Sequence, residues 1–121
     1  MFSNDDIIFA YTRKMAIDDG VLIDATEAAQ LCGFKVPMAI TIAAWVRCVT
    51  GNGRNVSADV AHRRLLLLLS DTWKACRNAN GNRVRFTYRP AFKNESVTLI
   101  LHIGPGDTAA PVCTLMEPDD D

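Results

Sequence analysis

The chain has 121 residues, of which 49% are hydrophobic and 22% are charged, and its formal net charge is −1. This length is enough for one domain with a sizeable core, and the near-neutral charge excludes bulk attraction to nucleic acid or to anionic membranes. The longest strictly apolar run, Leu65 to Leu69, is far shorter than the roughly 20 residues of a membrane-spanning helix. We therefore expect a single domain over residues 1–121, frayed at 1–6 and 117–121, that does not enter a membrane.

Cysteine usage indicates a reducing compartment. No two of the four cysteines are closer than 16 residues in the chain, which excludes the CxxC spacing of redox and zinc motifs. Acidic residues near the start stand where a secretion signal carries basic ones, so we expect a cytoplasmic protein. The cysteines are expected to act as small buried hydrophobes. The sequence predicts no catalytic residue, no metal site and no cofactor.

The first predicted element is a short helix that Thr12 caps and Gly20 closes. Asp18 and Asp19 lie at its carboxyl end, where each negative charge costs about 0.3–1 kcal/mol. The two acids are either solvated groups near a turn or contacts for a partner. We keep this pair as a candidate partner-contact site.

A second short helix is expected to start at Asp24 and to stop at Gly33. Asp24 can cap it, and Glu27, three residues later, completes a capping-box pair. Because carboxylates at this position are also available to a basic partner, Asp24 and Glu27 join the candidate partner-contact residues. The segment before this helix, 21–23, is expected to be extended.

Two further helices are predicted before the hydrophobic period changes. Pro37 suits the first turn of a third helix, whose apolar residues recur at helical spacing until Gly51. The longest helix is predicted over 58–79, with Ser57 as its cap. Its leucines cover more than one side, which is typical of a central, buried helix.

After Gly81 the hydrophobic period changes from 3.6 to 2. Alternating residues predict antiparallel strands near 83–89, 97–103 and 112–116. The fold class predicted from this order is α+β. About four N-terminal helices, the longest near 58–79, are expected to pack on a C-terminal three-stranded antiparallel meander.

The strands carry the remaining candidate residues. Arg83, Arg85 and Arg89 should share one strand face, which is either a solvated surface or a contact for an acidic protein or a nucleic acid. Asp107 follows a Gly-Pro-Gly turn, where it either caps its own backbone or contacts a partner. His102 and Cys113 would make a weak base–nucleophile pair if they faced each other across a hairpin.

Several stretches together form a pattern that spans residues 11 to 120. They are Tyr11-Thr12-Arg13, Ala16-Ile17-x-Asp19-Gly20-Val21-Leu22-x-Asp24, Gly33-Phe34-x-x-Pro37-x-Ala39, and Gly104-Pro105-Gly106-Asp107 followed by Pro111-Val112-x-Thr114-x-Met116-x-Pro118. With these motifs the chain resembles a family of small uncharacterised proteins encoded on bacterial plasmids, phages and integrative elements. The resemblance implies an accessory protein of a mobile element and assigns no activity.

The sequence favours a non-enzymatic protein that acts by protein–protein interaction. Its sharper form is an anti-defence inhibitor of a CRISPR or restriction complex, because acidic surfaces can occupy basic nucleic-acid channels. The alternative is a nucleic-acid-binding regulator that uses the arginine-lined sheet face. A small enzyme built around His102, Asp107 or Cys113 is a third reading. Homodimerisation through an exposed strand edge is compatible with all three.

Overall fold

The computed structural model describes residues 11–51 and 56–120, which form a mixed β-sheet with helices packed on one face. The sheet has five strands in the order β1-β2-β5-β4-β3. Neighbouring strands are antiparallel except for β2 and β5, which are parallel. The strands are β1 (Leu22–Asp24), β2 (Met38–Thr41), β3 (Arg83–Tyr88), β4 (Val97–Pro105) and β5 (Pro111–Met116).

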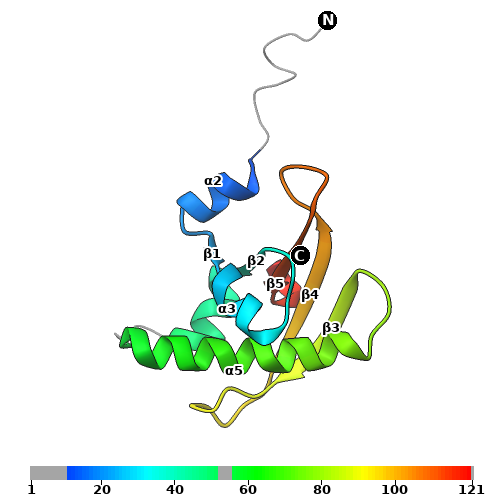
Figure 1. Ribbon diagram of the computed structural model, residues 1–121. Coiled ribbons are helices and arrows are strands. Elements are labelled where there is room, and N and C mark those ends of the chain that lie inside the picture. Colours follow the sequence, from blue (N-terminus) through cyan, green and yellow to red (C-terminus); the bar gives the residue numbers. More distant parts are fainter. Residues whose placement is uncertain (1–10, 52–55, 121) are drawn as a thin grey trace, which may run out of the picture.

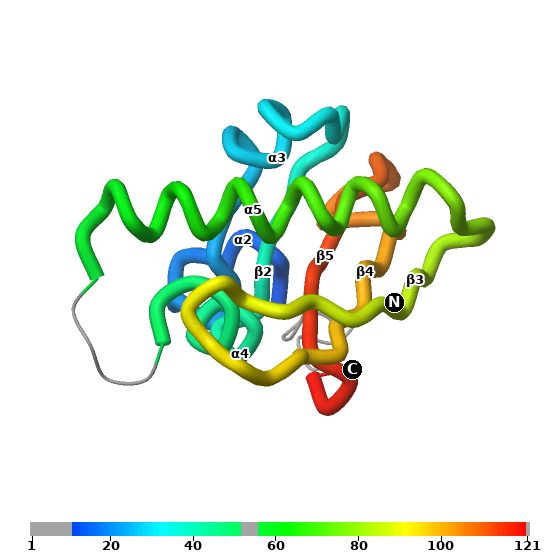
Figure 2. The backbone as a smooth tube through the Cα atoms, turned by 90° about the horizontal axis from the view of Figure 1, so that it is seen from below, coloured from blue at the N-terminus to red at the C-terminus, as the bar shows by residue number. Residues whose placement is uncertain are grey.

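The helices differ greatly in length and in position. They are α2 (Arg13–Asp18), α3 (Thr26–Cys32), α4 (Ile42–Trp45), α5 (Ala58–Arg77), the π-helical turn η1 (Val46–Thr50) that continues α4, and the 3₁₀ turn η2 (Pro118–Asp120). The long α5 runs across the sheet with α3 against it, whereas α2 stands apart beyond β1 (Figure 1). Seen from below, α5 crosses in front of β2, β5 and β4 (Figure 2). None of the helices within the described ranges is both long and apolar enough to cross a membrane.

The core lies between α5 and the sheet. Ser57 caps α5, because its hydroxyl accepts the N–H of Val60 at 3.2 Å. The sheet side of the helix buries Leu68 and Leu69 completely, in one cluster with inward-facing strand residues such as Leu101. The predicted helix over 58–79 is therefore confirmed within two residues at its end.

The three C-terminal strands were also predicted, and their alternation defines two faces. The inner face, which packs against α5, carries the buried side chains of Val84, Leu99, Leu101, Cys113 and Leu115. The residues between them point to the opposite, outer face. Because of this register, only polar side chains on the same face of the sheet can contact each other.

The expected three-stranded meander, with all helices N-terminal to it, is wrong. Strands β1 and β2 come from the N-terminal part of the chain and lie between helices, so the sheet has five strands instead of three. Met38, Ala39 and Ile40 are completely buried, so β2 lacks the alternation of a half-buried strand. Pro37, which was assigned to the first turn of a helix, instead precedes β2, and its carbonyl accepts the N–H of Cys113 at 2.7 Å.

The ends of the second helix differ in how well they were predicted. Gly33 ends α3 in the left-handed region, with φ of 113°, as expected. The capping box at the other end does not form, because the N-cap residue is Ala25. Asp24 accepts the N–H of Thr26 at 3.1 Å and its hydroxyl at 2.6 Å. Residues 118–120 form the turn η2, whereas residues 1–6 lie outside the described ranges.

Candidate functional site

The acidic candidates Asp18 and Asp19 lie at the carboxyl end of α2, and both are exposed. Asp18 pairs with Lys14 at 2.8 Å, four residues earlier on the helix, and this hydrogen bond raises the pKa of Lys14. Asp19 accepts the Tyr11 hydroxyl at 2.8 Å, which raises the pKa of that phenol. The pair therefore remains on the surface, beside the exposed side of α2.

The other two acidic candidates lie at the far end of β1. Asp24 is engaged with Thr26, and Glu27 is exposed in the first turn of α3. Because β1 (Leu22–Asp24) lies between them and the end of α2, these acids do not form one cluster with Asp18 and Asp19. The structure therefore places the four predicted acidic residues in two separate areas of the surface.

The arginine candidates are only partly brought together. Arg83 and Arg85 are exposed on the outer face of β3, where Arg83 is opposite His102 of β4. Arg89 follows the end of β3 at Tyr88, so the strand does not fix its side chain on that face. Within β3, the predicted arginine face therefore consists of Arg83 and Arg85.

The side chain of Asp107 caps the backbone at the start of α2 instead of the backbone of its own turn. Its Oδ1 accepts the N–H of Arg13 at 2.7 Å, and its Oδ2 accepts the N–H of Lys14 at 3.0 Å. These are backbone donors of the first turn of α2, which has no partners for them within the helix. A loop 94 residues away in the chain therefore holds the start of α2.

Arg13 extends this contact across the outer face of the sheet. Its guanidinium donates to the Thr114 hydroxyl at 2.7 Å and to the Cys113 carbonyl, both on β5. Partial burial lowers the pKa of Arg13, and the nearby Asp24 and Asp107 act against that effect. We call Arg13, Asp107 and Thr114 the junction, because they fasten α2 to the β4–β5 hairpin.

A strip of exposed apolar side chains lies on the same side as Asp18 and Asp19. It consists of Tyr11, Met15, Val21 and Ile42, all of which are exposed. Met15 lies on α2, Tyr11 precedes the N-cap residue Thr12 and Asp19 is the C-cap residue, and the hydrogen bond from Tyr11 to Asp19 connects the two ends of the helix. The N–H of Val21 donates to the Ala16 carbonyl at the end of α2, and the carbonyl of Val21 accepts the N–H of Ile42 at 3.0 Å. We call these four residues the apolar strip.

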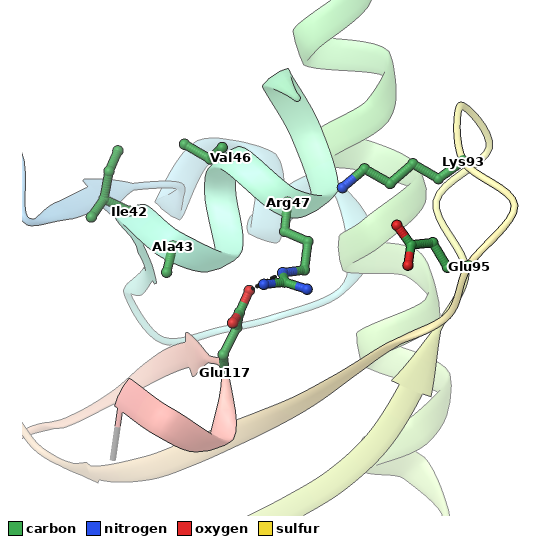
Figure 3. A pocket seen from close by; sticks show the side chains of 7 residues that line it. All are labelled: Ile42, Ala43, Val46, Arg47, Lys93, Glu95 and Glu117. Carbon is green, nitrogen blue, oxygen red and sulfur yellow. Dashed lines mark ion pairs between the residues drawn. The ribbon is translucent and has the colours of Figure 1, made fainter. Parts of the chain in front are cut away.

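Ile42 also borders a cleft of about 440 Å³ between α4, η1, the loop after β3 and the residue that follows β5. Its walls are Ile42, Ala43, Val46, Arg47, Lys93, Glu95 and Glu117. The four charged side chains point toward one another from three separate segments of the chain (Figure 3). We call this hollow the charged cleft.

The ion pair in the charged cleft is incomplete. Arg47 Nε lies 2.7 Å from Glu117 Oε1, within ion-pair distance. Oε1 is nevertheless buried and has no hydrogen-bond donor among the described residues, so the contact is one of charge without a directed N–H. The side chain of Glu117 is 14% exposed and that of Arg47 is 54% exposed. The acid is therefore fixed, whereas the arginine has room to move.

The thiols nearby are poor nucleophiles. Burial, together with a smaller effect of the charge of Glu117, raises the pKa of Cys48 to about 12. Burial also raises the pKa of Cys113 to about 11. Cys113 is opposite Ile103, and His102 is opposite Thr114, so His102 and Cys113 project from opposite faces of the sheet and form no base–nucleophile pair. Within the described ranges, no group of histidine, cysteine and acidic residues has an arrangement that could hold a metal ion.

Sequence reasoning missed the residues that make the cleft. Arg47, Lys93 and Glu95 belong to no motif, and Glu117 follows them by at least 22 residues in the chain. The apolar strip did leave a signal. Met15 is an apolar residue on the exposed side of a predicted helix whose opposite side offers only Ala16 to the core.

The comparisons with known proteins place the chain in a family without assigning an activity. No curated protein and no solved structure shows a significant match to it. A family of unknown function, DUF6573, matches residues 1–121. This confirms an uncharacterised family, whereas the expected origin on mobile elements stays a prediction. Because the match covers the whole sequence, the chain belongs to the family of unknown function DUF6573.

Proposed function

We propose that this protein is a non-enzymatic accessory protein that acts by binding a protein partner through the apolar strip and the acids beside it. The observation that supports this most is the way α2 is attached. Its only buried residue is Ala16, and hydrogen bonds to Asp107 and from Arg13 hold it in place. A helix fastened by polar contacts does not need Met15 on its exposed side in order to fold.

The composition of the surface supports a protein as the partner. Tyrosine and methionine are enriched in protein interfaces, where an apolar centre is surrounded by a polar rim. The strip supplies the centre, and Asp18 and Asp19 supply part of the rim. The ion pair of Asp18 with Lys14 is exposed and contributes little to stability, so a basic side chain of the partner can replace Lys14 in it.

The sharper form of the proposal is an anti-defence protein of a bacterial mobile element. Complexes that cut or bind foreign DNA hold it with basic residues, to which an exposed acid pair is electrostatically complementary. The partner would then be a CRISPR or restriction complex. A cell that carries such a system should lose part of its protection against a targeted plasmid when it expresses this protein.

A matched pair of variants tests the binding surface. Met15 is 47% exposed and Leu67 is 48% exposed, but Leu67 lies on α5, outside the strip. We expect the wild-type chain and Leu67→Glu to capture the same bacterial protein after nuclease treatment, and Met15→Glu to lose it. Binding of the purified partner to the three proteins, measured by calorimetry, should repeat this order.

Two outcomes would contradict the proposal. Equal binding of the partner by Met15→Glu and wild type would show that α2 does not make the contact. Capture that disappears on nuclease treatment, together with salt-dependent DNA or RNA binding that is lost in Arg85→Gln, would favour the nucleic-acid alternative.

A further inference from the structure

We propose that the charged cleft binds a small zwitterion, an aliphatic α-amino acid, at a site that adjoins the protein-binding strip and shares Ile42 with it. The cleft volume of about 440 Å³ lies within the range of small-molecule sites, about 300–1,000 Å³. Four charged ends converge on this space from η1, the loop after β3 and the chain after β5 (Figure 3). Such convergence is what a ligand with several polar groups requires.

The balance of charge selects the class of ligand. Arg47 and Lys93 are cations, and Glu95 and Glu117 are anions, so the lining has no formal net charge. A phosphate or a nucleotide would meet two carboxylates, and a polyamine would meet two cations. A ligand that carries one ammonium and one carboxylate on the same carbon presents one charge of each sign to the lining.

The state of Glu117 indicates where the ammonium binds. Its buried Oε1 lies 2.7 Å from Arg47 Nε but receives no directed N–H from the described residues, so this acceptor still lacks a well-aligned donor. An ammonium has three donors and can supply the missing one. To reach Oε1 it must displace Arg47, whose side chain is 54% exposed and therefore free to turn. The displaced guanidinium can then bind the ligand carboxylate with two parallel N–H groups.

The remaining wall fits an aliphatic side chain. Ile42, Ala43 and Val46 line it, and none of the described lining residues is aromatic, so a stacked base or an aromatic ring finds no partner there. Val46 and Arg47 belong to η1, a π-helical turn. Such turns are rare, and they often occur at functional sites because they change the direction of side chains. The backbone thus gives a second indication, independent of charge, that this place has a role.

The test uses the whole chain and three related probes. L-Leucine should bind with a dissociation constant of about 1 mM or lower, measured by calorimetry or by saturable NMR shifts at the cleft residues. L-Leucinamide lacks the carboxylate, and N-acetyl-L-leucine lacks the ammonium. Each should bind at least about tenfold more weakly, because it leaves one pair of charged residues without its counterpart.

Variants then assign the binding to the cleft. Lys93→Gln and Glu95→Gln should each weaken leucine binding at least about threefold, because each removes one charged contact. Lys74→Gln, on the exposed side of α5, should leave it unchanged. Absence of saturable leucine binding to the wild-type chain overturns the inference, and so does equal binding of leucine and its amide. Met15→Glu should retain leucine binding, so failure of one proposal is distinguishable from failure of the other.

Discussion

The junction and the charged cleft both bring an arginine and acidic side chains together, but they do so in different ways. At the junction, Asp107 accepts two backbone N–H groups and Arg13 donates to two oxygens of β5. In the cleft, Arg47 and Glu117 are close without a directed hydrogen bond. Contact distance alone therefore does not distinguish a charged side chain that stabilises the fold from one that is available to a ligand.

Hydrogen bonding and burial distinguish these two kinds of charged side chain. Arg13 is partly buried and donates two charge-assisted hydrogen bonds, which are lost if it moves. Arg47 is more than half exposed and has no directed hydrogen bond to Glu117, so less is lost when it moves. We therefore expect the junction to contribute to stability and the cleft to contribute little.

The largest expected effect comes from breaking the junction. Arg13→Ala should lower the free energy of unfolding by about 3 kcal/mol, because it removes two charge-assisted hydrogen bonds between α2 and β5. The matched variant Arg47→Ala should change it by no more than about 0.5 kcal/mol. Urea unfolding of both variants measures the difference, and equal losses would contradict the distinction between the two regions.

The same comparison explains which parts of the molecule could be predicted from sequence. The helix α5 and the strands of residues 83–116 have strong local periodicity, so their existence was predictable. Strand β2 is completely buried at three of its four residues and therefore shows no alternation. Its parallel pairing with β5 joins Ala39 to Thr114, and nothing local to either segment indicates it.

The candidate site was predictable to a smaller extent. Asp107 was expected to cap its own backbone or to contact a partner, whereas it caps the start of a helix 94 residues earlier in the chain. Arg47 and Glu117 meet only because β5 ends beside η1. Residue type and spacing carry information about neighbours along the chain, whereas these contacts depend on the sheet order.

A second prediction uses the buried thiols, one near each region. Cys48 lies near Glu117 and has a pKa raised to about 12, and Cys113 lies beneath Arg13 and has a pKa raised to about 11, from an ordinary value of 9.0. The folded state keeps protons that the unfolded state loses above about pH 9. The stabilisation is therefore complete below that pH and is lost progressively as the pH rises from about 9 through the folded pKa values.

We expect the free energy of unfolding to fall by about 2 kcal/mol between about pH 8 and pH 10. Cys48→Ala and Cys113→Ala should each reduce the slope, which chemical denaturation at a series of pH values would measure. Tyr88, whose pKa burial raises to about 12, adds to the loss only above about pH 10. A stability that stays constant over this range in the wild-type chain would show that the thiols are not protected from water.

The smallest expected effect distinguishes the two thiols. Burial is the main cause of the raised pKa of Cys48, and the charge of Glu117 is the next, whereas nearby Arg47 and Lys93 lower it. Glu117→Gln should therefore shift the titration of Cys48 to lower pH by a fraction of a unit, as followed by its Cβ chemical shift. The titration of Cys113 should not move, because Glu117 is not among the groups that act on it. An upward shift at Cys48 would mean that Arg47 turns away once Glu117 loses its charge, and this would directly measure the mobility that ligand binding in the cleft requires.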